Sequence, residues 1–125
     1  MVANSKIVAF APAREAERAK HFYSEVLGLR LVSEDQWALQ YDANGVTLRL
    51  QLANRFMPQP FTVLGWNVED VSATMAELKG RGVVFERFGF VQQDANGVWT
   101  TPDGSKVAWF KDSEGNLLSV TELPK

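Results

Sequence analysis

The spacing of apolar residues along the chain predicts strands and helices in a repeating order. Residues 6–11 (KIVAFA) form a short apolar run typical of a strand, and apolar side chains then recur at helical spacing from Ala16 to Leu27, before Gly28. Extended segments follow at residues 29–34, 37–42 and 46–52. The Asn44-Gly45 pair between the last two suits a tight hairpin. The first half is therefore predicted to contain a strand, a helix and three further strands.

The same order returns after a connector at residues 54–60, which contains two prolines and shows no periodicity. Residues 61–68 are predicted to form a strand, and Asp70 can cap a helix over residues 71–82. Further extended segments are predicted at residues 83–88, 106–112 and 117–123. The second half thus repeats the plan of the first.

The two halves differ in length because the second half contains an insertion. Val8 aligns with Val63 at an offset of 55 positions, whereas Asp42 aligns with Asp112 at an offset of 70. The second half therefore carries extra residues, most simply the stretch 92–104, whose own Asp-Ala-Asn-Gly turn repeats the turn chemistry at Asp42. Tandem copies of one supersecondary unit pair to bury a face that neither copy covers alone. We therefore expect two β-α-β-β-β units in an α+β fold.

Composition narrows the classes of function. The 125 residues suit one domain, and 13 Lys and Arg against 15 Asp and Glu leave no basic run for nucleic acid. No stretch approaches a membrane span, so we expect a cytoplasmic protein with no nucleic-acid or membrane partner. The absence of cysteine excludes disulfides, thiolate nucleophiles and cysteine metal sites. The single histidine, His21, is expected on the helix surface, since a lone histidine without partners is seldom catalytic.

Three motifs together resemble the vicinal oxygen chelate superfamily, which includes glyoxalase I, extradiol dioxygenases and the bleomycin resistance proteins. They are the helix AERAKHFYSEVLGL, the helix VEDVSATMAELKGRGV and the closing turn and strand KDSEGNLLSV. The resemblance implies an α+β fold of two tandem β-α-β-β-β units that form a curved mixed sheet, with helices on its outer face and the ligand site in its hollow. It implies a single domain over residues 1–125, with unit one at about residues 5–53, the connector at 54–60 and unit two at about 61–123.

Metal-dependent members of that superfamily place His or Glu at four inward positions. On this sequence the resemblance sets Val8 and Val63 at the two positions on first strands. It sets Arg49 and Ser119 at the two positions on last strands. Valine has no lone pair to donate, a serine hydroxyl is a weak ligand, and a guanidinium repels a divalent cation. We therefore expect a member that lacks the usual metal ligands and uses no metal or other cofactor.

Alternation along the strand at residues 46–52 predicts that Arg49 and Gln51 face the hollow, with the leucines between them under the helices. An inward guanidinium could hold a carboxylate or phosphate through a bidentate pair. The alternative is that Arg49 pairs with a structural acid such as Glu86 or Glu122.

The remaining ligand-binding candidates share the inward face of the other strands. They are Val8, Phe10, Val63, Asn67, Trp109, Ser119 and Thr121. For Asn67 the alternative is a hydrogen bond to the backbone at a strand end. For Ser119 and Thr121 the alternative is packing and cross-strand hydrogen bonding.

Four tryptophans are a high count for this length, and aromatic walls are common in small-molecule pockets. Core packing is nevertheless the better expectation for Trp66, and for each of Trp37, Trp99 and Trp109 taken singly, with the hollow or a dimer contact as the alternative. The region 88–104 lies where a lid is expected, and its aromatic rings could equally anchor it to the body.

These expectations favour metal-independent binding of a small molecule, aromatic or anionic in character, with sequestration or resistance as its role. The alternative is a glyoxalase-type lyase or isomerase of unknown substrate. Such an enzyme would need a general base near the hollow, and no available carboxylate is marked by its spacing: Glu34, Asp35, Glu86, Asp94 and Glu122. The resemblance also implies a homodimer.

Overall fold

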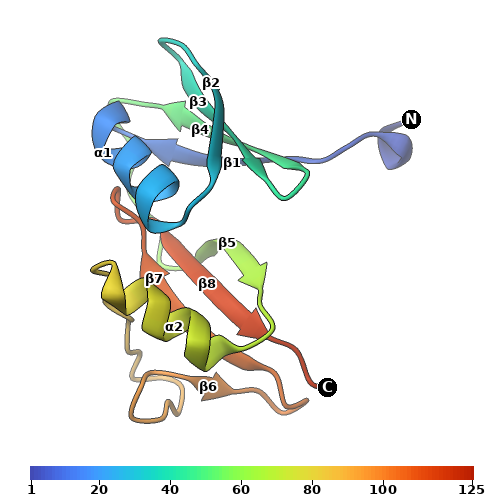
Figure 1. Cartoon of the computed structure of the whole chain (residues 1–125), viewed down its shortest axis with the longest axis vertical. Helices are drawn as coiled ribbons and strands as arrows, with labels where there is room; N and C mark the ends of the chain where they lie inside the picture. Colours follow the sequence, from blue (N-terminus) through green and yellow to red (C-terminus); the bar gives the residue numbers. More distant parts are fainter. The chain divides into compact units, whose positions relative to one another are not determined.

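The computed structural model describes residues 1–125, and the chain divides into two compact units, Met1–Pro58 and Gln59–Lys125. Each unit holds one four-stranded sheet with a helix against it (Figure 1). The chain therefore has an α+β fold built from two tandem units, which confirms the fold class that the repeat predicted. None of its helices has both the length and the apolar character that crossing a membrane requires.

The strands of the first unit form one mixed sheet. Its elements are η1 (Val2–Asn4), β1 (Val8–Ala13), α1 (Ala16–Lys20), η2 (His21–Val26), β2 (Arg30–Glu34), β3 (Ala38–Ala43) and β4 (Val46–Leu52). The sheet order is β1-β4-β3-β2, with β1 parallel to β4 and the other pairs antiparallel. The first and last strands of the unit are therefore neighbours, and Phe10 pairs with Arg49 across them.

The helix predicted in the first unit forms, but its second half, η2, is a π-helix. Gly28 follows it with a φ of 75°, a conformation that glycine adopts without strain. On the buried side of the helix, the ring of Tyr23 lies 5.9 Å from that of Tyr41 in the sheet. The hydroxyls of Tyr41 and Ser24 share a hydrogen bond of 2.8 Å, and burial raises the pKa of Tyr41. The helix is thus held to the sheet by both ring packing and a polar contact.

The hairpin predicted at Asn44-Gly45 joins β3 to β4. Both residues have positive φ, 52° and 92°, which is the conformation a two-residue hairpin turn requires. The N–H of Gly45 donates to Oδ1 of Asp42 at 2.8 Å and closes the turn. This hairpin sets the register of β4, the strand that carries Arg49.

The second unit repeats this plan with β5 (Thr62–Asn67), α2 (Val71–Gly80), β6 (Trp99–Thr100), β7 (Lys106–Lys111) and β8 (Leu117–Glu122). Its order, β5-β8-β7-β6, again places the first strand parallel to the last. Asp112 occupies the turn position predicted from Asp42, since its Oδ1 accepts from the backbone N–H groups of Glu114 and Asn116. Phe10 pairs with Arg49 and Gly65 pairs with Ser119, so the offsets of 55 and 70 agree with the pairing of the first and last strands of each unit.

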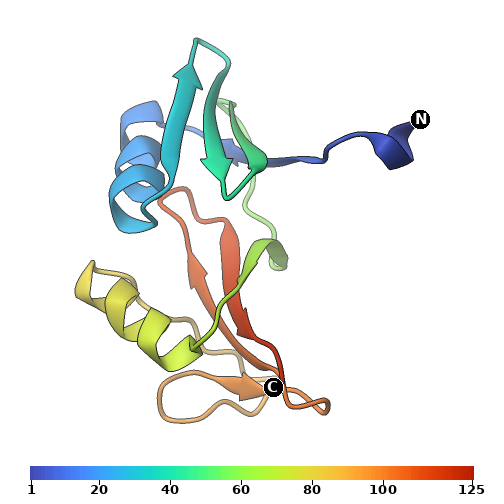
Figure 2. The same ribbon diagram turned by 45° about the vertical axis from the view of Figure 1, so that its right-hand side comes forward.

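Two carboxylates hold the start of α2. Oδ1 of Asp70 accepts from the N–H of Ala73 at 3.0 Å, which confirms the predicted cap. Oε1 of Glu122, on β8, accepts from the N–H of Val71 at 2.9 Å. Figure 2 shows α2 lying across one side of the β7–β8 pair. The buried residues of this layer are Val71, Met75, Leu78, Ala108, Phe110, Leu118 and Val120.

The strand predicted at residues 83–88 is wrong. Only Phe85 forms a bridge, to Phe110, and the adjacent Glu86 N–H donates to the Trp109 carbonyl at 2.8 Å. The strand beside this edge of β7 is instead β6, which lies inside the stretch assigned to the insertion. The outer edge of β7 is thus covered by two separate pieces, because the loop 87–98 interrupts the strand between them.

That loop is closed by its own polar side chains. The Gln93 amide accepts from the N–H of Phe88 and donates to the carbonyls of Glu86 and Gly97. The Arg87 guanidinium donates to two further carbonyls of the loop. These bonds satisfy backbone groups that a continuous strand would otherwise pair.

Candidate functional site

Strand β4 exposes one face and buries the other, as the alternation predicted. Leu48 and Leu50 are 2% and 0% exposed, whereas Arg49 and Gln51 are exposed. Phe10 on the neighbouring β1 is also exposed, at 53%. The face opposite the helix therefore carries a cation, an amide and an aromatic ring.

A pocket of about 300 Å³ opens on this face of the first unit. It is lined by Phe10, Ser33, Asp35, Trp37, Ala38, Gln40, Arg49 and Gln51. Three of the sequence-predicted residues, Phe10, Arg49 and Gln51, are thus brought together, while Val8 is exposed on β1 outside the lining. The volume lies at the small end of ligand pockets, which span about 300–1,000 Å³.

Arg49 is oriented within the pocket by two neighbours and by no acid. Its Nη2 donates to Oε1 of Gln40 at 2.9 Å, and its guanidinium carbon lies 5.9 Å from the Phe10 ring centroid. The two structural acids considered from sequence have other partners. Glu86 lies 3.9 Å from the Nζ of a lysine on β7, and Glu122 caps α2. The charge of Arg49 is therefore available to a ligand from the pocket side.

The carboxylates considered as general bases each make structural contacts. Lys20 donates to Glu34 at 2.9 Å, and its hydrogen bonds to Glu17 and then to Glu34 raise the pKa of this lysine. Asp35 accepts from the backbone N–H groups of its own turn. The N–H of Val98 donates a hydrogen bond to Oδ1 of Asp94 at 3.0 Å, and this bond lowers the pKa of Asp94.

The lone histidine, His21, is exposed at the start of η2, as expected.

The second unit presents a different surface on its corresponding face. The indole N–H of Trp109, on β7, donates to the hydroxyl of Thr62, on β5, at 3.0 Å. Because β8 lies between β7 and β5, the Trp109 side chain must pass over β8 to make this bond. Thr62 was not predicted from the sequence. A bulge between Thr62 and Leu64 breaks the strand alternation, and nothing in the sequence marks that bulge.

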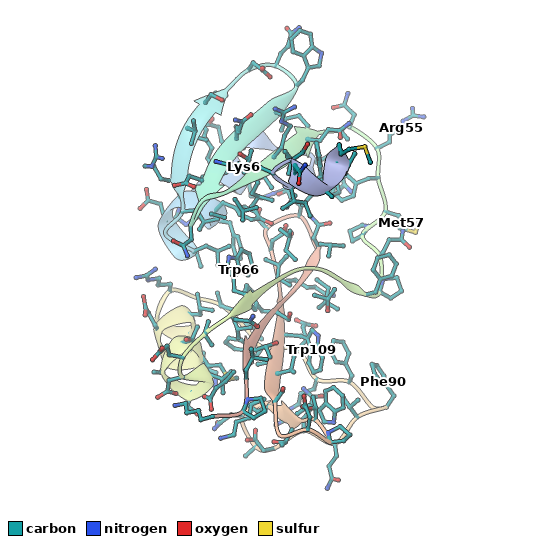
Figure 3. All side chains as sticks on the ribbon, turned by 90° about the vertical axis from the view of Figure 1, so that its right-hand side faces the viewer. Lys6, Arg55, Met57, Trp66, Phe90 and Trp109 are labelled. Atoms are coloured by element: carbon teal, nitrogen blue, oxygen red, sulfur yellow. The ribbon has the colours of Figure 1, made fainter.

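Three further rings extend from Trp109. The Trp99 ring stacks on it at 6.0 Å with an interplanar angle of 21°, and the Phe88 ring meets it edge-on at 5.3 Å. The Phe90 ring stacks on Phe88 at 5.4 Å and is 82% exposed (Figure 3). We call Trp99, Trp109, Phe88 and Phe90 the aromatic platform.

The expectation of core packing is wrong for Trp37, Trp99 and Trp109. Trp37 is 67% exposed in the turn between β2 and β3, and Trp99 and Trp109 are only partly buried. Trp66 is also partly buried, on β5. The fully buried aromatic side chains are instead Tyr23, Tyr41 and Phe110.

Ser119, on β8, adjoins the aromatic platform at Trp109. It pairs with Trp109 on one side and with Gly65 on the other, and it is 7% exposed. A Cβ on Gly65 would lie 2.7 Å from its Oγ, so glycine makes the room that the hydroxyl occupies. No side chain of the protein hydrogen-bonds this hydroxyl.

The remaining candidates lie on β5 and β8. Asn67 is exposed and pairs with Thr121, which is partly exposed, at the far ends of these strands. Val63 lies at a bulge between Thr62 and Leu64. Strict alternation therefore does not hold at Val63, and the hydroxyl of Thr62 reaches Trp109 instead.

The residues at the four positions that the resemblance assigns to metal ligands do not fit a metal ion. Val8 and Val63 offer no donor atom, Arg49 is cationic, and only Ser119 carries an oxygen. No group of three or more His, Cys, Asp or Glu side chains that could hold a metal occurs in the structure. The donor set itself therefore argues against a metal centre at these positions.

The sequence from residue 7 to residue 120 matches the family model described as Glyoxalase/Bleomycin resistance protein/Dioxygenase superfamily. No curated protein matches the chain. Among solved structures, a glyoxalase family protein from Enterococcus faecalis is similar with a TM-score of 0.75 and 21% identity, over 98% of this chain and 100% of that one.

Two other solved structures differ in what they are named for. Lactoylglutathione lyase from Agrobacterium tumefaciens is similar with a TM-score of 0.73 and 18% identity, over 95% of this chain and 93% of that one. TnmS3, an antibiotic binding protein from Streptomyces sp. CB03234, is similar with a TM-score of 0.68 and 25% identity, over 97% of this chain and 98% of that one. The likeness to the lyase, at this identity, shows the fold alone.

Proposed function

Because the chain belongs to the Glyoxalase/Bleomycin resistance protein/Dioxygenase superfamily, we propose that it binds a small anionic or aromatic molecule without a metal ion. Sequestration of that molecule, as in a resistance protein, is the role we propose for the binding. TnmS3, a similar chain, is described as an antibiotic binding protein, which supports binding of a small molecule.

The observation that carries the proposal is that Arg49 lines a pocket and contacts no carboxylate. Its guanidinium lines a pocket beside Phe10, and within its unit it pairs with the neutral amide of Gln40 and with no carboxylate. A cation that no carboxylate contacts gains from an anionic ligand, and its planar fork suits a carboxylate. The one acid in the lining, Asp35, accepts from the backbone N–H groups of its own turn. The exposed ring of Trp37 adds an apolar wall.

The contacts of the carboxylates favour binding over catalysis. Each acid considered as a general base is occupied by a lysine, a turn or a helix start. Examples are the bond of Glu34 to Lys20 and that of Glu122 to the Val71 N–H. A lyase or isomerase of the glyoxalase type would need one of these acids released for proton transfer.

The assembly that we propose is a cytoplasmic homodimer in which residues 1–125 act as one domain. The first strand of each unit, β1 or β5, is an edge strand and pairs on one side only, so it offers free backbone groups to a second copy. Native mass spectrometry gives the number of chains, and a single cooperative unfolding transition would support one domain.

The function is tested with two matched probes, 2-naphthoate and its neutral amide, by isothermal titration calorimetry. Arg49→Ala is expected to weaken naphthoate binding about tenfold or more, and to weaken binding of the amide much less. Arg55→Ala is the control, because Arg55 is exposed in the connector and does not line the pocket. An equal loss for both probes, or none, would contradict the anion-binding role.

The same samples separate binding from catalysis. Mass spectrometry of the recovered ligand is expected to return naphthoate unchanged after prolonged incubation with the protein. A product that forms with the protein and not with Arg49→Ala would overturn the binder in favour of an enzyme. A tightly held divalent ion in the purified protein would contradict the metal-independent site.

A further inference from the structure

The aromatic platform of the second unit has a defined shape before any ligand arrives. The bond from Trp109 to Thr62 prevents the indole from turning about its side-chain bonds, and stacking on Trp99 fixes its other side. The loop that supplies Phe88 and Phe90 is closed by the three hydrogen bonds of Gln93. A rigid set of rings lowers the entropy cost of stacking a ligand ring on it.

A polar group without a partner lies at the base of this platform. Ser119 is more than nine-tenths buried, and its hydroxyl forms no hydrogen bond within the protein. No fully buried side-chain polar atom lacks a partner in the structure, so this hydroxyl keeps a narrow opening to the surface. A desolvated hydroxyl gains from a hydrogen bond that a ligand supplies.

We propose that the aromatic platform is a subsite that stacks a planar, uncharged aromatic ring, and that the Ser119 hydroxyl donates a hydrogen bond to a carbonyl oxygen on that ring. This goes beyond the proposed function, since the platform lies in the second unit and the pocket around Arg49 lies in the first. It uses none of the residues of the pocket around Arg49.

The chemistry of the platform selects against charge and against saturated rings. The four rings carry no charge, the indole N–H of Trp109 donates to the hydroxyl of Thr62, and Ser119 is the cross-strand neighbour of Trp109. Offset or edge-on contacts with aromatic faces favour a flat π-system over a saturated ring of the same size. The exposed ring of Phe90 leaves its end of the platform accessible to a ligand (Figure 3).

The test follows the four indole N–H signals of the ¹⁵N-labelled protein by NMR while coumarin or naphthalene is added. Both probes are neutral, flat and bicyclic, but only coumarin carries a carbonyl. Trp99 and Trp109 signals are expected to shift with both probes, and the Trp37 signal, in the other unit, is expected to stay in place. Tryptophan-to-phenylalanine variants assign the four signals.

Two variants separate stacking from hydrogen bonding. Trp99→Leu is expected to weaken both probes about tenfold. Ser119→Ala is expected to weaken coumarin about fivefold, the value of one hydrogen bond, and to leave naphthalene unchanged. Dispersed amide spectra of each variant establish that it folds, so a loss of binding reports on the subsite.

Other outcomes would overturn the subsite. If Trp99 and Trp109 do not shift at saturating probe, or if their signals are already protected because a second copy covers them, the platform is not a ligand surface. If Ser119→Ala weakens both probes equally, the hydroxyl has no role in recognition. These results do not affect the test of naphthoate binding with Arg49→Ala. In turn, a negative result with Arg49→Ala does not affect the indole signals, so the two proposals can fail separately.

Discussion

The indole N–H of Trp109 on β7 donates to the hydroxyl of Thr62 on β5 across the strand that separates them, at 3.0 Å. This one bond ties together three of the four strands of the second sheet. It also fixes the position of the tryptophan beside Ser119, its cross-strand neighbour on β8. The aromatic character of this face therefore depends on a hydroxyl at the first residue of β5.

Replacing Thr62 with valine keeps the shape of the side chain and removes this bond. We expect Thr62→Val to lower the free energy of unfolding by about 1 kcal/mol, because the indole N–H loses its partner. The Trp109 indole proton should also exchange faster with solvent, which NMR measures directly. Thr100→Val on the exposed edge strand β6 is the control, and an equal effect there would contradict a specific bond.

Substitutions at Gly65 and Ser119 are predicted to have non-additive effects on stability, because the two residues share the same space. In Gly65→Ala the new methyl would lie 2.7 Å from Oγ of Ser119, so we expect a loss of about 1–3 kcal/mol in the free energy of unfolding, measured by urea denaturation. Adding Ser119→Ala removes the clashing atom and should restore most of that loss. If the two substitutions instead add independently, the hydroxyl does not occupy the space beside Gly65.

The parts of the site that depend on local patterns could be predicted from the sequence. Alternation placed Arg49 and Gln51 on the open face, because the leucines between them form a strict period of two. The Asn-Gly turn set the register of that strand, and the repeat located the matching turn at Asp112. These features are governed by neighbours in the chain.

The predictions that failed concern places where a bulge or a loop interrupts the local sequence pattern. A bulge in β5 changes which side chain meets Trp109, so counting from Val63 could not find Thr62. Residues 83–88 have the composition of a strand, yet the following loop interrupts the edge and leaves its outer position to β6. Tryptophan is as suited to a ligand wall as to a core, and composition alone could not separate the two.

The start of α2 is predicted to depend on two acids that act separately. Asp70→Ala removes the bond to the Ala73 N–H and should cost about 1 kcal/mol of stability. Glu122→Ala leaves the Val71 N–H without its partner on β8 and should cost about 1–2 kcal/mol, since that contact is partly buried. Thermal unfolding compares them with Glu69→Ala, which changes an exposed acid outside the helix. Losses no larger than that of this control would contradict the capping contacts.

The loop that carries the aromatic platform is predicted to loosen in acid through Asp94. The N–H groups of Val98 and Asn96 hold the pKa of this carboxyl below its ordinary value of 3.8. A group whose pKa is lowered on folding stabilises the folded loop above its unfolded value, and this contribution is lost as the pH falls through the folded value. The Val98 amide should therefore keep its chemical shift down to about pH 4 and move at lower pH.

Asp94→Asn keeps an oxygen that can accept the same bonds but removes the titration. In this variant the Val98 amide should no longer follow the carboxylate at low pH, while the amides of the turn at Asp112 should behave as in the parent protein. A parallel change in coumarin binding would show that the carboxylate supports the platform by holding Phe88 and Phe90 in place. If the Val98 shift follows the same acid profile in the variant and the parent, another group controls the loop.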